Sequence, residues 1–222
     1  MKKALYTINF GDYNPLREPL VITPGWDYVV FSDKDLQSAN FKVKKHEVSR
    51  GGHLSARDFY INSQKYMPDY DLTVMIGSQI QVNCDLDKFL QKYCDLGCDF
   101  NMMNHGRNCI FKEANENKKF FGEKGKQRID LQMERYKSEG MPENYGLFAH
   151  GIIIRQKSKE IAEHERLWWE EVKNPEYVTR DQLSFMYVLW RHGLVTVCGF
   201  DSYWDILHNE FKIFKHGTWK GL

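Results

Sequence analysis

The sequence predicts a layered α/β domain, in which strands alternate with helices around one central sheet. The strongest strand signal is the largely apolar run at residues 72–76, which ends at Gly77 and is typical of a buried central strand. The strongest helix signal lies at residues 178–191, where apolar side chains recur at helical spacing. Other short apolar runs and helical patterns alternate along the chain, which favours an α/β sheet.

The remaining elements follow from the same patterns and from the turn residues between them. Strands are expected at residues 3–10, 28–31, 41–48, 72–76, 100–103, 148–155 and 194–197. Helices are expected at residues 54–67, 85–93, 110–117, 126–137, 159–173 and 178–191. The length of 222 residues and the hydrophobic content of 42% suit one large domain. We expect residues 1–198 to form that domain, with residues 199–222 packed against it as a tail.

The helix at residues 178–191 carries the first candidate for chemistry. Thr179 and Gln182 have the spacing of a capping box, the start signal of a helix. One apolar face follows, made of Leu183, Met186, Tyr187 and Trp190. Asp181 falls in the first turn, where the helix dipole favours an ionised carboxylate, and such a group can accept a proton from a hydroxyl. The alternative is that Asp181 only stabilises the start of the helix.

Charge and cysteine content exclude several classes of protein. With 31 Lys and Arg against 30 Asp and Glu, the net charge of +1 argues against nucleic acid as a partner. The N-terminus lacks a long apolar segment, so neither a signal peptide nor a membrane span is expected. The five cysteines show no CxxC pair, so we expect no zinc site, and reduced thiols in the cytoplasm are the simplest interpretation.

Candidate binding residues follow from the general position of ligands in α/β sheets, outside the carboxyl ends of the strands. The polar residues that end or follow predicted strands are Thr7, Asp33, Ser78, Gln79, Arg107 and His150. Each also has a purely structural interpretation. Thr7 and Asp33 suit turn chemistry, Arg107 can pair with Glu113 to hold a loop, and His150 can be a structural histidine.

Several short motifs occur in a fixed order between residues 4 and 192. They are Tyr6-Thr7, Phe10-Gly11-Asp12-Tyr13, residues 27–33, Ala56-Arg57, residues 105–110, Glu113-Ala114, Gln132-Met133, residues 168–171 and residues 180–185. This ordered series resembles a family of GT-A-type glycosyltransferases that includes plant mucilage and cell-wall glycosyltransferase-like proteins, formerly a domain of unknown function. It is also similar to a chlorovirus-encoded sugar transferase.

The resemblance implies a GT-A-like mixed central sheet flanked by helices, with residues 1–198 as a nucleotide-sugar transferase domain. It implies transfer of a hexosyl or deoxyhexosyl group from a nucleotide-diphosphate sugar, with a UDP-sugar favoured, to a hydroxyl of a glycan acceptor. Asp181 would be the general base or a sugar-orienting carboxylate, and Gln182 a hydroxyl contact. Thr7, Asp33 and Arg57 would surround the base, ribose and phosphates, although Arg57 on a helix also suits a surface ion pair.

A divalent metal, Mn²⁺ or Mg²⁺, is also implied, but the sequence departs from the usual metal motif. GT-A enzymes place an Asp-x-Asp pair after the central strand, and this chain has Gly77-Ser78-Gln79 there. Asp69-Tyr70-Asp71 precedes the strand and Asp85-Leu86-Asp87 opens a predicted helix, so neither pair suits that role. Ser78 and Gln79, together with His208, are the remaining candidates for a weak oxygen and nitrogen site.

Three consequences of this departure stay open at the level of sequence. The metal binds weakly, or Lys and Arg side chains replace it, or catalysis is lost. The last option gives the alternative function, a catalytically silent nucleotide-sugar- or glycan-binding module. A third possibility, a hydrolase, is disfavoured because the chain has no GxSxG elbow and no dense His/Asp cluster.

Overall fold

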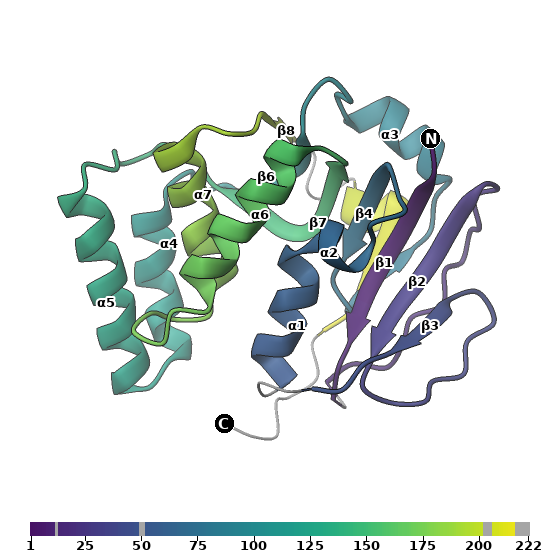
Figure 1. The fold of residues 1–222 in the computed structure, drawn as a ribbon, viewed down its shortest axis with the longest axis horizontal. Helices are drawn as coiled ribbons and strands as arrows, with labels where there is room; N and C mark the ends of the chain where they lie inside the picture. The colour runs from purple at the N-terminus through teal and green to yellow at the C-terminus, as the bar shows by residue number, and fades with distance from the viewer. Residues whose placement is uncertain (12, 49–51, 202–205, 216–222) are drawn as a thin grey trace.

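A seven-stranded mixed sheet forms the centre of the computed structural model, which describes residues 1–11, 13–48, 52–201 and 206–215 (Figure 1). Its strand order is β3-β2-β1-β4-β7-β6-β8. The strands are β1 (Lys3–Asn9), β2 (Trp26–Ser32), β3 (Lys42–Lys45), β4 (Leu72–Ile76), β6 (Phe100–Asn104), β7 (Phe148–Gln156) and β8 (Val197–Phe200). β7 runs antiparallel to both of its neighbours, β4 and β6, and the other pairs are parallel. The carboxyl ends of β1, β2, β4 and β6 therefore meet the start of β7 at one edge.

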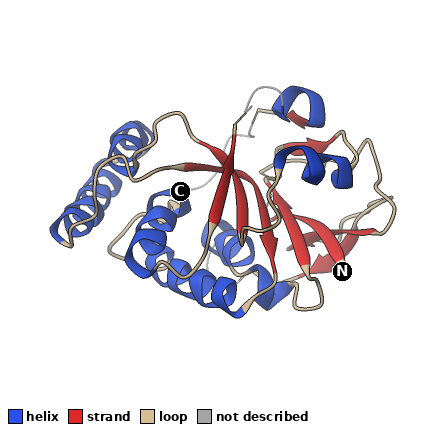
Figure 2. Cartoon of the chain, turned by 90° about the horizontal axis from the view of Figure 1, so that it is seen from above, coloured by secondary structure: helices blue, strands red, loops and turns tan. Residues whose placement is uncertain are grey.

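Two hydrophobic cores cover the two faces of the sheet because successive residues of a strand point to opposite sides. Tyr6 belongs to one core and Leu5 to the other. The larger core takes in α1 (Gly52–Ile61), α2 (Ser63–Tyr66), α4 (Ile110–Asn117), α5 (Glu123–Ser138), α6 (Lys159–Val172) and α7 (Asp181–His192). The other contains α3 (Leu86–Tyr93) and a two-stranded ribbon of β5 (Ile80–Val82) and β9 (Phe211–Ile213). Figure 2 shows these helices on both sides of the sheet.

The predicted mixed α/β sheet flanked by helices is confirmed, and most predicted elements lie within a few residues of their expected positions. The last strand of the sheet is the exception, because it occupies residues 197–200 instead of 194–197. β5 and β9 were not predicted, since three-residue strands carry little periodic signal. β8 runs across residue 198, and residues 206–213 form a π-helical turn (η2, Ile206–Glu210) followed by β9. Asp12 of the predicted motif and tail residues 202–205 and 216–222 lie outside the described residues.

One buried ion pair interrupts the helix predicted at residues 54–67. The chain leaves the helix at Asn62, so that α1 ends at Ile61 and α2 begins at Ser63. The guanidinium of Arg155 donates to the carbonyl oxygens of Tyr60 and Ile61, each at 2.7 Å, in place of the amides of a continued helix. Arg155 also pairs with the buried Glu165 at 2.8 Å.

Two cysteines contradict the expectation of five reduced thiols. Cys98, before β6, and Cys198, in β8, form a disulfide, whereas Cys84, Cys94 and Cys109 are free. Disulfides persist in oxidising compartments, which does not suit the cytoplasmic thiols expected from the sequence. Asp95, Cys98 and Cys198 are also the one group of three potential metal ligands found among the described residues. In the same part of the chain, no helix is long and apolar enough to cross a membrane.

We predict that Arg155→Ala lowers the free energy of unfolding by about 3–5 kcal/mol, because it leaves the Glu165 carboxylate buried without its charge partner. Urea denaturation followed by circular dichroism measures this. The control is Lys173→Ala, which removes the exposed Lys173–Glu170 pair and is expected to cost less than about 1 kcal/mol. Equal effects of the two substitutions would contradict the proposed importance of the buried pair.

Candidate active site

A pocket of ≈ 700 Å³ lies at the edge of the sheet where β6 ends and β7 begins. Its lining combines amides, guanidinium groups, imidazoles and a carboxylate. These groups come from residues that include Asn104, Arg107, Glu113, His150, Arg180 and Gln182. The volume falls in the range of about 300–1,000 Å³ that small-ligand sites occupy. Three residues predicted from the sequence, Arg107, His150 and Gln182, therefore line one pocket.

Asp181 lies behind the pocket wall as a buried, ionised carboxylate, with only 3% of its surface exposed. One carboxylate oxygen is 3.0 Å from Nη1 of Arg57 in α1, and the other is 2.7 Å from Nδ1 of His150 in β7. Burial by itself raises the pKa of a carboxyl group. Here Arg57 and the hydrogen bond from His150 outweigh burial and hold the pKa of Asp181 well below its usual range.

His150 presents one ring nitrogen to Asp181 and leaves the other without a partner. Its Nε2 is buried and makes no hydrogen bond to the described residues, although the residue lines the pocket. Burial lowers the pKa of His150, and the opposing effect of Asp181 does not reverse this, so the ring is neutral at pH 7. Because the ionised Asp181 can only accept, the proton lies on Nδ1 and Nε2 carries the lone pair. His150 is therefore arranged to accept a proton at Nε2.

A β-bulge places His150 in this position. Met102 pairs with Ile153, but its neighbour Met103 pairs with Ala149, so residues 150–152 of β7 have no partner in β6. Bulges of this kind redirect side chains next to functional sites. The His150 backbone is held by the hydroxyl of Tyr60, which donates to its carbonyl oxygen at 2.5 Å. The rings of Trp168 and Phe185 enclose the imidazole edge-on.

Polar residues at the start of α7 bond to α1 and β7 and do not form the predicted capping box. The helix begins at Asp181, and its N-cap residue Arg180 makes no side-chain capping bond. Thr179 instead contacts Nδ1 of His53 at 3.2 Å, and Nε2 of Gln182 donates to the carbonyl oxygen of Phe148 in β7 at 2.7 Å. The polar residues that predicted a cap join α7 to α1 and to the strand that carries His150.

A second buried carboxylate, Glu113 in α4, also lines the pocket. Arg107 donates to it at 2.5 Å and Asn117 at 2.9 Å, while Nη2 of Arg180 is 4.0 Å away. The Arg107–Glu113 pair considered from the sequence is thus present. The side chains of Arg107 and Arg180 nevertheless stay 40% and 39% exposed, so both guanidinium groups remain accessible to an anionic or hydroxylated ligand.

Thr7 and Asp33 lie on the other side of β4, away from the pocket lining. Thr7 is buried inside β1, where its hydroxyl has no partner among the described residues. Both carboxylate oxygens of Asp33 accept from the amide of Gly11, at 3.0 and 3.1 Å. Asp33 therefore has the turn contact that was its structural alternative, although the turn lies at the carboxyl edge of the parallel strands.

Ser78 and Gln79 follow a residue that is hydrogen-bonded beside His150, but they do not form a metal site with His208. The amide of Gly77 donates to the carbonyl oxygen of Gly151, next to His150. The hydroxyl of Ser78 accepts from Asn14 at 2.7 Å, and the Gln79 amide folds over Gly77. In the β5–β9 ribbon Phe214 bonds to Gln79 and Glu210 to Asn83, which places η2, and His208 with it, beyond the opposite end.

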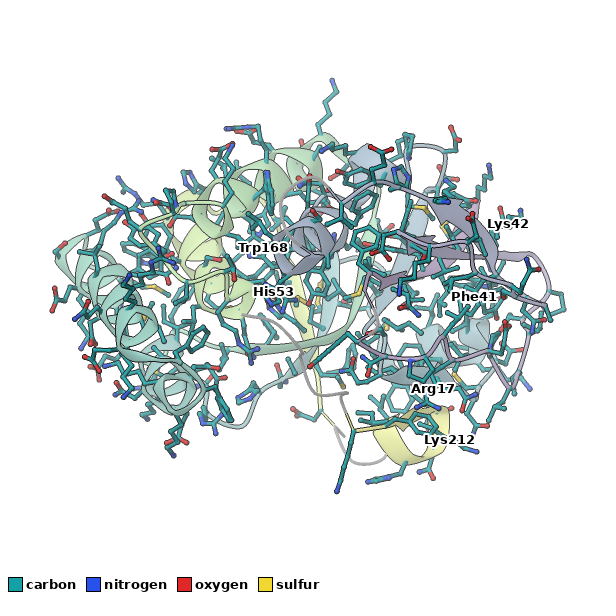
Figure 3. The ribbon with its side chains drawn as sticks, turned by 90° about the horizontal axis from the view of Figure 1, so that it is seen from below. Arg17, Phe41, Lys42, His53, Trp168 and Lys212 are labelled. Carbon is teal, nitrogen blue, oxygen red and sulfur yellow. A yellow bond between two sulfur atoms is a disulfide. The ribbon has the colours of Figure 1, made fainter. Side chains whose placement is uncertain are left out.

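The described residues therefore do not fit a divalent metal at Ser78 and Gln79. They supply a hydroxyl and an amide there, without a carboxylate, whereas Mn²⁺ and Mg²⁺ favour carboxylate ligands. Asp85 caps α3 and accepts from the amide of Lys88, and Asp71 accepts from the amide of Lys2. One aspartate of each Asp-x-Asp match thus makes a structural hydrogen bond. In Figure 3, Arg17 and Lys212 mark the region of the β5–β9 ribbon, apart from His53 and Trp168 beside the helices.

Three residues near Asp181 were not singled out from the sequence. Arg180 lies between the two carboxylates, and its charge acts on the pKa of His53 and of Tyr13. Burial lowers the pKa of His53 to about 4, so this ring is neutral at pH 7. Only the adjacency of Arg180 to Asp181 offered a sequence signal, because Tyr13 and His53 reach the site from loops and helices far away in the chain.

Comparison with known proteins decides the family. The model of the TOD1/MUCI70 glycosyltransferase-like domain matches residues 63–213, more than half of the chain. The chain belongs to the TOD1/MUCI70 family. The resemblance noted from the sequence motifs is thereby confirmed, and α1 with Arg57 lies just before the matched segment of this TOD1/MUCI70 protein.

Comparisons with solved structures and with curated protein sequences do not extend this assignment. The apo crystal structure of mouse xyloside xylosyltransferase 1 is similar to the TOD1/MUCI70 protein with a TM-score of 0.45 and 11% sequence identity, covering 96% of this chain and 94% of that one. This distant similarity carries no argument about chemistry. No curated protein sequence matches the chain.

We predict that Asp181→Asn removes the preference of His150 for the Nδ1–H tautomer, since an amide can donate as well as accept at that position. ¹⁵N chemical shifts of the labelled histidine rings report the tautomer. Asp33→Asn is the matched control, because within the described part of the chain Asp33 bonds to the Gly11 amide, and it is expected to leave the His150 signals unchanged. Unaltered His150 signals in Asp181→Asn would contradict the arrangement.

Proposed function

We propose that this TOD1/MUCI70 domain transfers a sugar from a nucleotide-diphosphate sugar to an acceptor hydroxyl, with His150 as the proton acceptor. The observation that carries the proposal is Nε2 of the pocket-lining His150, which has no partner among the described residues while Nδ1 contacts an ionised carboxylate. The acceptor oxygen attacks the anomeric carbon, the bond from that carbon to the diphosphate breaks, and the hydroxyl proton passes to Nε2.

Asp181 takes a positioning role in this proposal. Both of its oxygens already have basic partners, and its low pKa makes it a poor proton acceptor at neutral pH. It holds the imidazole in the tautomer that can accept a proton, and it stabilises the imidazolium that forms. Gln182 positions β7 through Phe148 and reaches the pocket, where its amide can contact a hydroxyl.

The donor is proposed to bind at the carboxyl edge of β1, β2 and β4, with a UDP-sugar carrying a hexosyl or deoxyhexosyl group as the favoured class. Asp33 and the Gly77–Gln79 loop lie at that edge, and the amide of Gly77 donates to the carbonyl oxygen of Gly151, next to His150. A diphosphate leaving group needs its charge neutralised. Because Ser78 and Gln79 do not suit a metal, we assign this role to the guanidinium groups of Arg57 and Arg180.

One observation keeps a second candidate function in view. Gly77 occupies the position of the leading metal-binding aspartate, which would also be expected of a module that binds a nucleotide sugar or glycan without turnover. Such a module requires the pocket and the arginines but not the proton-accepting nitrogen. The two functions therefore differ in the effect of changing His150.

Calorimetry with UDP-, GDP- and dTDP-sugars, in the presence of EDTA or of Mn²⁺, tests the donor assignment. We expect binding of at least one of these donors in EDTA, with little gain from Mn²⁺. Binding that requires Mn²⁺ would contradict the assignment of Arg57 and Arg180, and no binding of any donor would overturn the proposed function.

For the donor that binds, His150→Gln is predicted to lower kcat by about 10²–10⁴-fold while donor affinity stays unchanged. In the unsubstituted protein, kcat should rise with pH and level off above the depressed pKa of His150, because only the neutral ring accepts a proton. Lys126→Gln, on the exposed side of α5, is the control and should match the parent. Donor binding without turnover in the parent protein would favour the silent module.

A further inference from the structure

We propose that Phe120 is a stacking platform for a pyranose ring of the acceptor, an inference that rests on the proposed glycosyltransferase function. Phe120 ends the 3₁₀ helix η1 (Lys118–Phe120) between α4 and α5, and it lines the same pocket as His150. It is 83% exposed, the largest value of any large hydrophobic side chain in the described part of the chain.

Phe120 is exposed although the turn that carries it packs against the core. The next residue, Phe121, packs against the larger hydrophobic core. Gly125 in α5 makes room for that ring, because a Cβ on Gly125 would lie 2.7 Å from Cβ of Phe121. The core position of the turn is thus filled by Phe121, and Phe120 is left facing the pocket.

The turn that carries Phe120 is held from both sides. Lys118 forms an ion pair with Asp130 in α5, and the amide of Phe121 donates to the carbonyl oxygen of Lys118 at 3.2 Å. Asn117, just before the turn, donates to the buried Glu113 at 2.9 Å. A turn fixed in this way loses little backbone freedom when a ligand stacks on the ring that it carries.

The surroundings of the ring suit a sugar better than an apolar partner. A pyranose has C–H groups on its faces and hydroxyls around its edge, so it needs an aromatic surface beside polar hydrogen-bonding groups. The pocket supplies amides from Asn104 and Gln182 and a guanidinium from Arg107. An isolated ring among such groups does not form the contiguous apolar patch that marks a protein or membrane contact.

The topology assigns this platform to the acceptor and not to the donor. β7, with His150, lies between β4 on one side and β6 on the other. The proposed donor edge is on the β4 side, whereas Phe120 follows α4 in the lining of the pocket, which also includes Arg180, the proposed diphosphate contact. The acceptor is therefore assigned to Phe120 and the donor to the β4 edge, with His150 between them.

Saturation-transfer NMR with methyl pyranosides of the gluco, galacto, xylo and rhamno series tests the platform on the full chain, and calorimetry with UDP is run in parallel. We expect at least one pyranoside to bind through the C–H protons of one ring face. Phe120→Ala should weaken that binding at least ten-fold, whereas Phe120→Trp should retain it. UDP affinity should be the same in all variants.

Leu131→Ala is the matched control, since Leu131 is an exposed hydrophobic side chain on α5, and it should behave as the parent protein. The platform is overturned if no pyranoside binds, if Phe120→Ala binds as well as the parent, or if Phe120→Ala weakens UDP, which would make the ring a nucleobase contact. Phe120-dependent pyranoside binding without any binding of UDP or of a nucleotide sugar would instead overturn the proposed donor and leave the platform standing.

Discussion

The buried carboxylate of Asp181 is the interaction on which the site depends. An ionised group removed from water is costly unless each of its oxygens is paired. Here Arg57 from α1 and His150 from β7 satisfy the side chain, and the indole of Trp168 from α6 donates to the Asp181 backbone carbonyl at 2.9 Å. One residue at the start of α7 thus joins three other elements. The same bonds leave the lone pair of the His150 ring on Nε2, so the stability of this corner and its chemistry have a common origin.

Glu113 repeats this arrangement in the pocket lining, and the charge of Arg180 acts on both carboxylates. Each buried anion is balanced by more than one basic side chain, so the pocket lining combines guanidinium groups and neutral imidazoles with carboxylates that are already paired. That surface suits an anionic leaving group on one side and a hydroxylated acceptor on the other. The exposed Phe120 adds an apolar surface to a pocket that is otherwise polar.

Local sequence patterns predicted a helix or strand correctly where its own apolar side chains determine the element. The run at residues 72–76 became β4, and the apolar spacing after Asp181 became α7. Prediction was wrong where a distant side chain competes with local bonding. Arg155, about ninety residues away in sequence, takes the carbonyl oxygens that would have continued α1. Thr179 binds His53 in place of capping α7. Neither partner is visible in a window of ten or fifteen residues.

The sequence by itself determined the α/β class, the positions of most helices and strands, and the identity of Asp181, His150 and Arg107 as candidates, because hydrophobic periodicity and turn residues act locally. Arg57 became a candidate through the family resemblance. Tertiary structure alone decided which of these meet. The bulge in β7 turns His150 toward the pocket, and the sheet order places it between β4 and β6. Pairing across the sheet also separates His208 from Ser78 and joins Cys98 to Cys198. Such contacts depend on strand register and chain crossing, which no short stretch of sequence encodes.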